Sequence, residues 1–115
     1  MEELYKAKKV RAIGVSNFTL DRLIDLGLFN DVAPMVNQIE IHPFYGQPET
    51  VEYMQKDGVV AEAWSSLAAG RNDIFANKTL AGIGAKHGKS IAQVTLRWLV
   101  QRGMPSGMMS LLTVR

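Results

Sequence analysis

Val36-Asn37-Gln38-Ile39-Glu40-Ile41 is the stretch that decides the fold, because it is a short apolar run that His42-Pro43 stops. Proline has no backbone N–H to donate, so a strand ends readily there. Similar runs at residues 11–16 and 59–64 are separated from it by segments with helical patterns. Strands that alternate with helices indicate α/β architecture with a parallel sheet.

Helix start and stop signals frame these strands. Thr19 can cap a helix after the first strand, and Pro48 suits the first turn of a second helix, which Gly58 ends. Ser90-Ile91-Ala92-Gln93 forms a capping box that opens the clearest helix. The other expected elements are a loop at residues 65–78, a short helix at residues 79–86 closed by Gly88, Gly103 just past the last helix, and a fourth strand or a loose tail at residues 108–114.

The composition excludes several classes of function. Of 115 residues, 47% are hydrophobic and 21% charged, and a net charge of +2 is too small to indicate nucleic acid or an anionic membrane. The absence of cysteine removes disulfides and thiolate metal sites, and two histidines argue against a histidine metal site. No apolar stretch approaches the roughly 18 residues of a membrane span, and no signal peptide opens the sequence. We therefore expect a cytoplasmic protein without a metal.

Four strings of residues, in matching order and spacing, closely resemble the aldo-keto reductase family. Any one of them alone is weak evidence, but four in register are strong. The resemblance implies a TIM (β/α)8 barrel, of which residues 1–103 are the C-terminal half, roughly strands 5 to 7 with their helices, and residues 104–115 a divergent tail. A closed barrel takes about 250 residues. The four strings are Gly14-Val15-Ser16-Asn17-Phe18, residues 36–44, Ala63-Trp64-Ser65-Ser66-Leu67, and residues 86–103.

The resemblance implies a site for NADP(H), and three polar residues match its nicotinamide end. Ser16 and Asn17 match the pair that hydrogen-bonds the carboxamide, and Gln38 matches the residue that joins them. A carboxamide needs donor and acceptor partners, which these side chains supply without charge. These positions are expected at the C-terminal ends of the strands, where barrel enzymes place their sites. From the sequence alone, Ser16 and Asn17 could equally be a strand end that feeds a helix cap.

Three further positions match the rest of the cofactor. Trp64 falls where the family stacks an aromatic ring, usually tyrosine, on the nicotinamide, and a flat face of this kind orients the ring. Ser65 and Leu67 match the start of the segment that binds the pyrophosphate. Trp98, on an apolar helix face, is expected to pack in the core.

The family's catalytic residues have no counterpart here. Its reduction uses a tyrosine as general acid, tuned by a lysine and an aspartate, with a histidine that helps to place the carbonyl. These belong to the first half of the barrel, and Tyr5, Tyr45 and Tyr53 match no catalytic position. His42 is expected to be structural. Residues 104–110 replace the family's Ile-Pro-Lys-Ser strand end, whose lysine, with a later arginine, grips the 2′-phosphate of NADPH.

Other features have plainer explanations. Glu62 is expected as a polar position on a strand. Gly82-Ile83-Gly84 resembles a dinucleotide loop, but it lies inside a helical pattern and not after a strand. The basic residues of 6–11 are expected to form a solvated helix end, and His87 to lie exposed at the end of another helix.

We therefore expect a fragment of an oxidoreductase that reduces aldehydes or ketones to alcohols with NAD(P)H. Its substrate is a small-molecule carbonyl compound, and the isolated chain is expected to be inactive until an N-terminal half supplies the proton donor. The alternative is a non-catalytic chain, either a half-barrel that covers its open edges by self-association or a truncated gene product.

Overall fold

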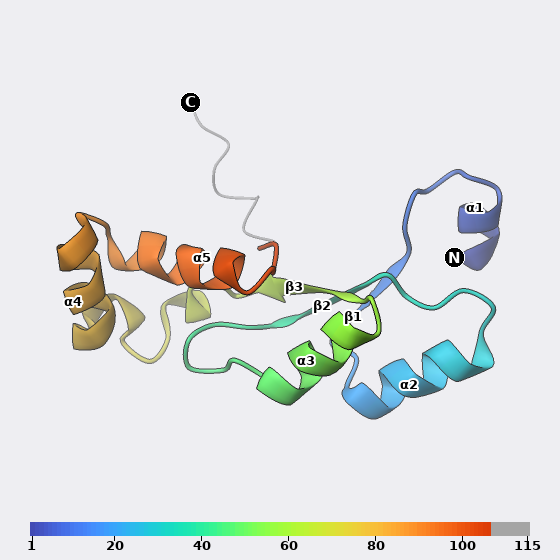
Figure 1. The fold of residues 1–115 in the computed structure, drawn as a ribbon, viewed down its shortest axis with the longest axis horizontal. Coiled ribbons are helices and arrows are strands. Elements are labelled where there is room, and N and C mark those ends of the chain that lie inside the picture. Colours follow the sequence, from blue (N-terminus) through green and yellow to red (C-terminus); the bar gives the residue numbers. More distant parts are fainter. Residues whose placement is uncertain (107–115) are drawn as a thin grey trace. The chain divides into compact units, whose positions relative to one another are not determined.

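The computed structural model describes residues 1–106 and has an α/β fold with a parallel sheet, as expected (Figure 1). Its strands are β1 (Gly14–Ser16), β2 (Val36–Glu40) and β3 (Val60–Trp64), in the sheet order β1-β2-β3. Strands β1 and β2 are parallel and pair residue for residue, with Ser16 opposite Gln38. The described chain divides into two compact units, residues 1–39 with 47–62, and residues 40–46 with 63–106.

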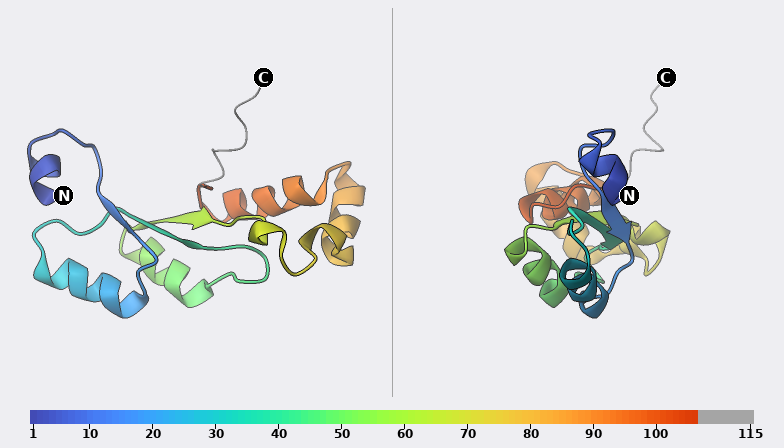
Figure 2. Two further views of the ribbon diagram at one scale, coloured as in Figure 1. Left: turned by 180° about the vertical axis from the view of Figure 1, so that it is seen from behind. Right: turned by 90° about the vertical axis from the view of Figure 1, so that its right-hand side faces the viewer.

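The first unit contains two helices that lie side by side, α2 (Leu20–Phe29) and α3 (Pro48–Lys56), as Figures 1 and 2 show. A short helix, α1 (Glu2–Lys6), precedes them. The helices contribute few core residues because each buries one narrow apolar stripe. The buried apolar side chains of this unit are Ile13, Leu23, Ile39, Val51, Met54, Val59 and Ala61.

Local signals set the ends of these helices as expected. Thr19 is the N-cap of α2 with an extended backbone, and a hydrogen bond from its side chain holds the pKa of Asp21 below its usual range. Pro48 is the first residue of α3, and Gly58, just past its end, has φ +73°. A positive φ favours glycine, so the helix ends where the sequence predicted.

The second unit contains α4 (Lys78–His87), α5 (Ile91–Gln101) and the 3₁₀ turns η1 (Ala68–Gly70) and η2 (Ile74–Ala76). Both halves of the predicted capping box form, with Gln93 N–H donating to Ser90 Oγ and Ser90 N–H donating to Gln93 Oε1. Helix α4 ends on Gly88, which has φ +61°. Turn η2 packs against both helices, and Ile74 and Leu99 are fully buried.

Several expectations from the sequence were wrong in detail. The basic cluster at residues 6–11 is a helix end only at Lys6, the last residue of α1, because Lys8 has φ +56°, outside the helical region. The first strand begins at Gly14 and not at residue 11. The loop at residues 65–78 contains two 3₁₀ turns. Trp98 is half-buried, with the Arg102 guanidinium 4.6 Å from its ring centroid, so it is not a core residue.

The segment after α5 pairs with β3. Ala63 N–H donates to Pro105 O over 2.9 Å, and Ala63 and Ser106 form a parallel bridge. The fourth strand or tail expected at residues 108–114 lies outside the described residues. Within residues 1–106 no helix is long and apolar enough to cross a membrane.

Candidate functional site

Ser16, Asn17 and Gln38 meet where β1 ends, beside the middle of β2. One carbonyl joins them, since Gln38 O accepts from Ser16 Oγ at 3.0 Å and from Asn17 N–H at 2.9 Å. Ser16 and Asn17 are exposed and Gln38 is half-buried, so all three side chains can meet a ligand. The structure thus brings together the three polar residues predicted for the nicotinamide end.

Asn17 turns the chain from β1 toward α2. Its φ is +57°, in the left-handed region that asparagine tolerates better than most residues. This turn leads from the strand end into the Thr19 cap. Asparagine at this position therefore has a backbone role in addition to any role of its side chain.

Asn37 holds this turn in place, and the sequence analysis missed it. Its fully buried side chain accepts from Phe18 N–H at 3.3 Å and donates through Nδ2 to Phe18 O at 2.9 Å. The available signal was an amide inside an apolar strand, since a buried amide needs partners on both its ends. The Ser16–Asn17 turn is thus fixed on one side by Gln38 O and on the other by Asn37.

Gln38 is held through its side chain as well. Its Nε2 donates to Glu62 Oε1 at 3.0 Å. Glu62 lies on β3, as expected, and it is half-buried. This contact was not predicted, because the two residues are 24 positions apart in the sequence.

The second unit contains the other predicted cofactor residues. Trp64 is the last residue of β3, half-buried, and its carbonyl accepts from Ile41 N–H at 3.3 Å. Ser65 follows with φ +55°, and within the described chain its buried Oγ has no hydrogen-bond partner. Leu67 is the N-cap residue of η1. These three residues therefore lie on one strand-to-turn junction.

A second contact missed from the sequence fixes this junction. Arg71 forms an ion pair with Glu40 at the end of β2, and its Nε donates to Ala68 O at 3.1 Å. Glu40 Oε1 also lies 3.4 Å from Nε2 of His42, whose ring is buried. His42 thus belongs to the packing around a strand end, which agrees with its expected structural role.

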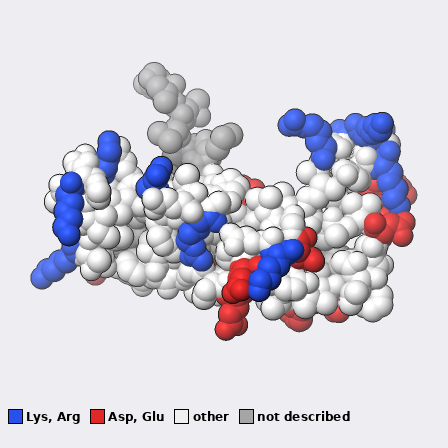
Figure 3. Space-filling view, in the orientation of Figure 1, with Lys and Arg blue, Asp and Glu red and all other residues white. Residues whose placement is uncertain are grey.

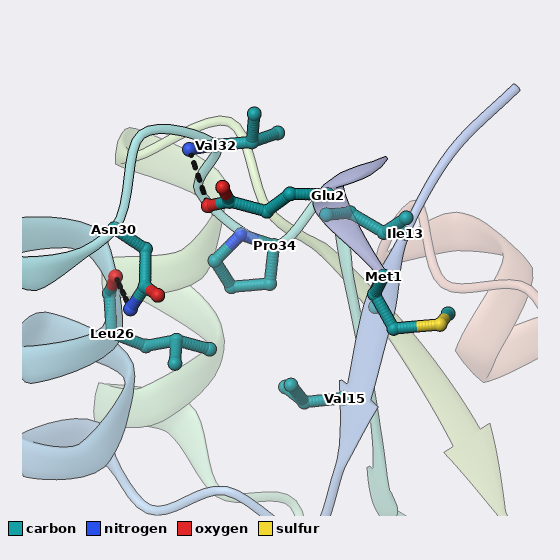
Figure 4. Close-up of a pocket in the computed structure, with 9 residues that line it drawn as sticks. Met1, Glu2, Ile13, Val15, Leu26, Asn30, Val32 and Pro34 are labelled. Atoms are coloured by element: carbon teal, nitrogen blue, oxygen red, sulfur yellow. Dashed lines mark hydrogen bonds between the residues drawn. The ribbon is translucent and has the colours of Figure 1, made fainter. Parts of the chain in front are cut away.

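A cavity of about 260 Å³ lies elsewhere in the first unit (Figure 4). Val32 N–H donates to Glu2 Oε1 at its rim, over 3.0 Å, and Asn30 Nδ2 donates to Leu26 O over 2.9 Å. None of the predicted cofactor residues lines it. In residues 1–106 no group of three or more His, Asp or Glu side chains could hold a metal ion.

Comparison with known proteins gives a family match over the whole chain. The model of the aldo/keto reductase family matches residues 1–115. Aldose reductase B of Dictyostelium discoideum is 40% identical over 104 residues, and glyoxal reductase of Bacillus subtilis is 46% identical over 104 residues. These alignments cover 90% of this chain but 33% and 37% of the two relatives. The chain therefore spans about a third of the length of the curated relatives it matches.

Solved structures agree with this match. An aldo-keto reductase from a deep-sea metagenome library has a TM-score of 0.89 and 38% identity, covering 91% of this chain and 39% of that one. An aldo-keto reductase crystallised with NADPH has a TM-score of 0.82 and 37% identity, with 91% of this chain and 35% of that chain covered.

Proposed function

The chain belongs to the aldo/keto reductase family, and we propose that it is the cofactor-holding part of an enzyme that reduces aldehydes or ketones with NAD(P)H. In this proposal residues 1–103 are the C-terminal half of a (β/α)8 barrel, roughly strands 5 to 7 with their helices, and residues 104–115 are a divergent tail. The substrate is a small-molecule carbonyl compound.

The observation that carries the proposal is the meeting of Ser16, Asn17 and Gln38 at Gln38 O. Strand β1 ends there beside Gln38, two residues before the end of β2, and barrel enzymes place their sites at the carboxyl ends of their strands. Uncharged hydroxyl and amide groups suit a carboxamide, which offers two N–H donors and one carbonyl acceptor. These residues would hold the nicotinamide end of the cofactor.

The other residues proposed for the cofactor lie in the second unit, and their roles are taken from the family resemblance. The Trp64 ring is proposed to stack on the nicotinamide, and Ser65 and Leu67 to begin the pyrophosphate segment. The buried, unpartnered Ser65 Oγ is a donor suited to a phosphate oxygen. Residues 40–46 and 63–106 carry six Lys and Arg against two Asp and Glu, an excess that favours a polyanionic ligand. Figure 3 shows part of this excess over α4 and α5.

In this proposal the chain contributes to the reaction by binding and orienting the cofactor. When bound, the nicotinamide supplies the hydride. The side chains of this chain bind and orient the ring, so that one of its faces meets the carbonyl carbon. The proton for the resulting alkoxide must come from a general acid, and no tyrosine of this chain matches the family's. We therefore propose that an N-terminal half supplies it.

Complementation tests the proposal. The chain is mixed with an N-terminal half of the B. subtilis glyoxal reductase, and NADPH oxidation is followed with an aldehyde as substrate. The expected result is turnover by the mixture and none by either part alone. A mixture no faster than the N-terminal half alone would contradict the proposal, as would turnover by the pure chain.

Self-association is a second candidate, and the position of β1 favours it. In the described sheet β1 has a neighbour on one side, and Gly14 and Ser16 are exposed. An unpaired edge strand is a template for another chain. Sedimentation of the isolated chain distinguishes the two candidates, because a concentration-dependent dimer without cofactor affinity supports this one alone.

A further inference from the structure

We infer that Glu62 is a positioning residue that sets which end of the Gln38 side-chain amide meets the cofactor. The inference rests on the proposed role of Gln38 as a carboxamide ligand and adds to it a cause of specificity. Glu62, which lies on a strand and is not catalytic, would favour a cofactor whose pyridine ring carries a carboxamide over one that carries another group.

The direction of the contact follows from the chemistry of its two partners. A carboxylate has acceptors alone, so the end of the amide that faces Glu62 must be the NH2 group. The observed hydrogen bond, from Gln38 Nε2 to Glu62 Oε1 at 3.0 Å, has this direction. Hydrogen bonds to a charged partner are also stronger than neutral ones, which favours this orientation over the flipped one.

The backbone of Gln38 is fixed at the same time. Its carbonyl accepts from Ser16 Oγ and Asn17 N–H, at 3.0 and 2.9 Å. The side chain of Gln38 is thus held at its tip by Glu62 and at its base by β1. Within residues 1–106 Gln38 Oε1 accepts no hydrogen bond, so an acceptor and one remaining N–H are offered to a ligand.

This arrangement selects the chemistry of the ligand. Gln38 Oε1 accepts an N–H of the nicotinamide carboxamide. In a cofactor with an acetyl group in place of the carboxamide, a methyl group replaces the NH2 group. A methyl group donates no hydrogen bond, so Gln38 Oε1 is left unpaired. Without the Glu62 carboxylate the amide of Gln38 is free to flip and to donate to the acetyl oxygen. Glu62 therefore discriminates between the carboxamide and acetyl cofactors without contacting them, by fixing the orientation of the Gln38 amide.

Titration by NMR of the full ¹⁵N-labelled chain tests this with two probes, NADP⁺ and its 3-acetylpyridine analogue. The wild-type chain is expected to bind NADP⁺ about three- to tenfold more tightly, the value of one neutral hydrogen bond. In Glu62→Gln the two affinities are expected to differ by less than about twofold, because a glutamine can accept from or donate to Gln38. The matched control is Glu52→Gln, an exposed carboxylate on α3, which should keep the wild-type ratio.

The outcomes separate the two proposals. An unchanged ratio in a folded Glu62→Gln chain overturns the inference and leaves the proposed function standing. Failure of the wild-type chain to bind either probe overturns both. If Glu62→Gln does not fold, NMR spectra of the unliganded wild-type chain still test the inference. The side-chain NH2 protons of Gln38 should then show nuclear Overhauser contacts to the Glu62 side chain, and the absence of these contacts overturns the inference.

Discussion

The side-chain amide of Asn37 is hydrogen-bonded to both backbone polar groups of Phe18. Phe18 N–H donates to Oδ1 at 3.3 Å, and Nδ2 donates to Phe18 O at 2.9 Å. Phe18 directly follows the Ser16–Asn17 turn, so a buried residue of β2 determines where the exposed polar residues at the end of β1 lie.

Substitution of Asn37 should therefore affect stability and the site together. Asn37→Ala leaves two backbone groups of Phe18 without their partner, at an expected cost of roughly 2–4 kcal/mol in the free energy of unfolding. Urea unfolding measures it. Asn30→Ala, which removes an exposed amide that donates to Leu26 O, is the control and should change stability by less than about 0.5 kcal/mol. Equal effects from the two variants would contradict the assigned role of Asn37.

Two glycines of the first unit should respond in opposite directions to alanine. A Cβ at Gly14 would lie 2.6 Å from Val36 O, so Gly14→Ala forces β1 away from β2 at an expected cost of roughly 1–3 kcal/mol. A Cβ at Gly27, within α2, meets nothing within 4 Å, and Gly27→Ala should stabilise the chain by up to about 1 kcal/mol. Thermal unfolding of both variants checks this. Destabilisation by Gly27→Ala, or none by Gly14→Ala, would speak against the described packing.

The ion pair between Lys6 and Asp31 should give stability a weak pH dependence. The hydrogen bond from Lys6 and its charge lower the pKa of Asp31, and the same hydrogen bond raises the pKa of Lys6. The Asp31 contribution is present above its unfolded pKa and is lost as pH falls below about 4. The Lys6 contribution is present below its unfolded pKa and is lost as pH rises past about 10.4.

Because both side chains are exposed, the effect should be small and screened by salt. Comparison of wild type and Asp31→Asn by urea unfolding measures it. The difference in stability should be largest between these limits and at low ionic strength. A difference that persists at pH 2 would show that Asp31 acts in some other way.

The Arg71–Glu40 ion pair should restrain the segment that follows β3. Arg71→Ala removes both this contact and the hydrogen bond to Ala68 O, so the backbone amides of residues 66–76 should exchange their hydrogens faster. Arg97→Ala changes an exposed arginine of α5 and is the control. Mass spectrometry of exchange reports both. Unchanged protection of residues 66–76 in Arg71→Ala would remove Arg71 from this role.

The sequence predicted those parts of the fold that depend on neighbouring residues. The Ser90–Gln93 box, the Pro48 start of α3 and the Gly88 end of α4 each act within one helical turn, so their signals are local. The same reasoning failed at residues 6–11, where the charges suited a helix end but Lys8 adopts a left-handed conformation. The residues next to Lys8 contain no signal that predicts this conformation.

The candidate site was predictable in part for the same reason. Ser16, Asn17 and Gln38 were found because they match a family pattern at strand ends. Asn37 with Phe18, Glu62 with Gln38, and Arg71 with Glu40 were not found, since each pair joins residues that are 19 to 31 positions apart. Such contacts depend on strand register, which a single sequence specifies only through its alternation of side chains.

The most direct test of the central claim is a map of NADP⁺-induced chemical-shift changes in the full ¹⁵N-labelled chain. We predict that the largest changes fall on the backbone amides of Ser16, Asn17 and Gln38 and on the side-chain NH2 groups of Asn17 and Gln38. Changes confined to the cavity that Glu2 and Asn30 line, or no changes at all, would contradict the claim that this turn holds a nicotinamide.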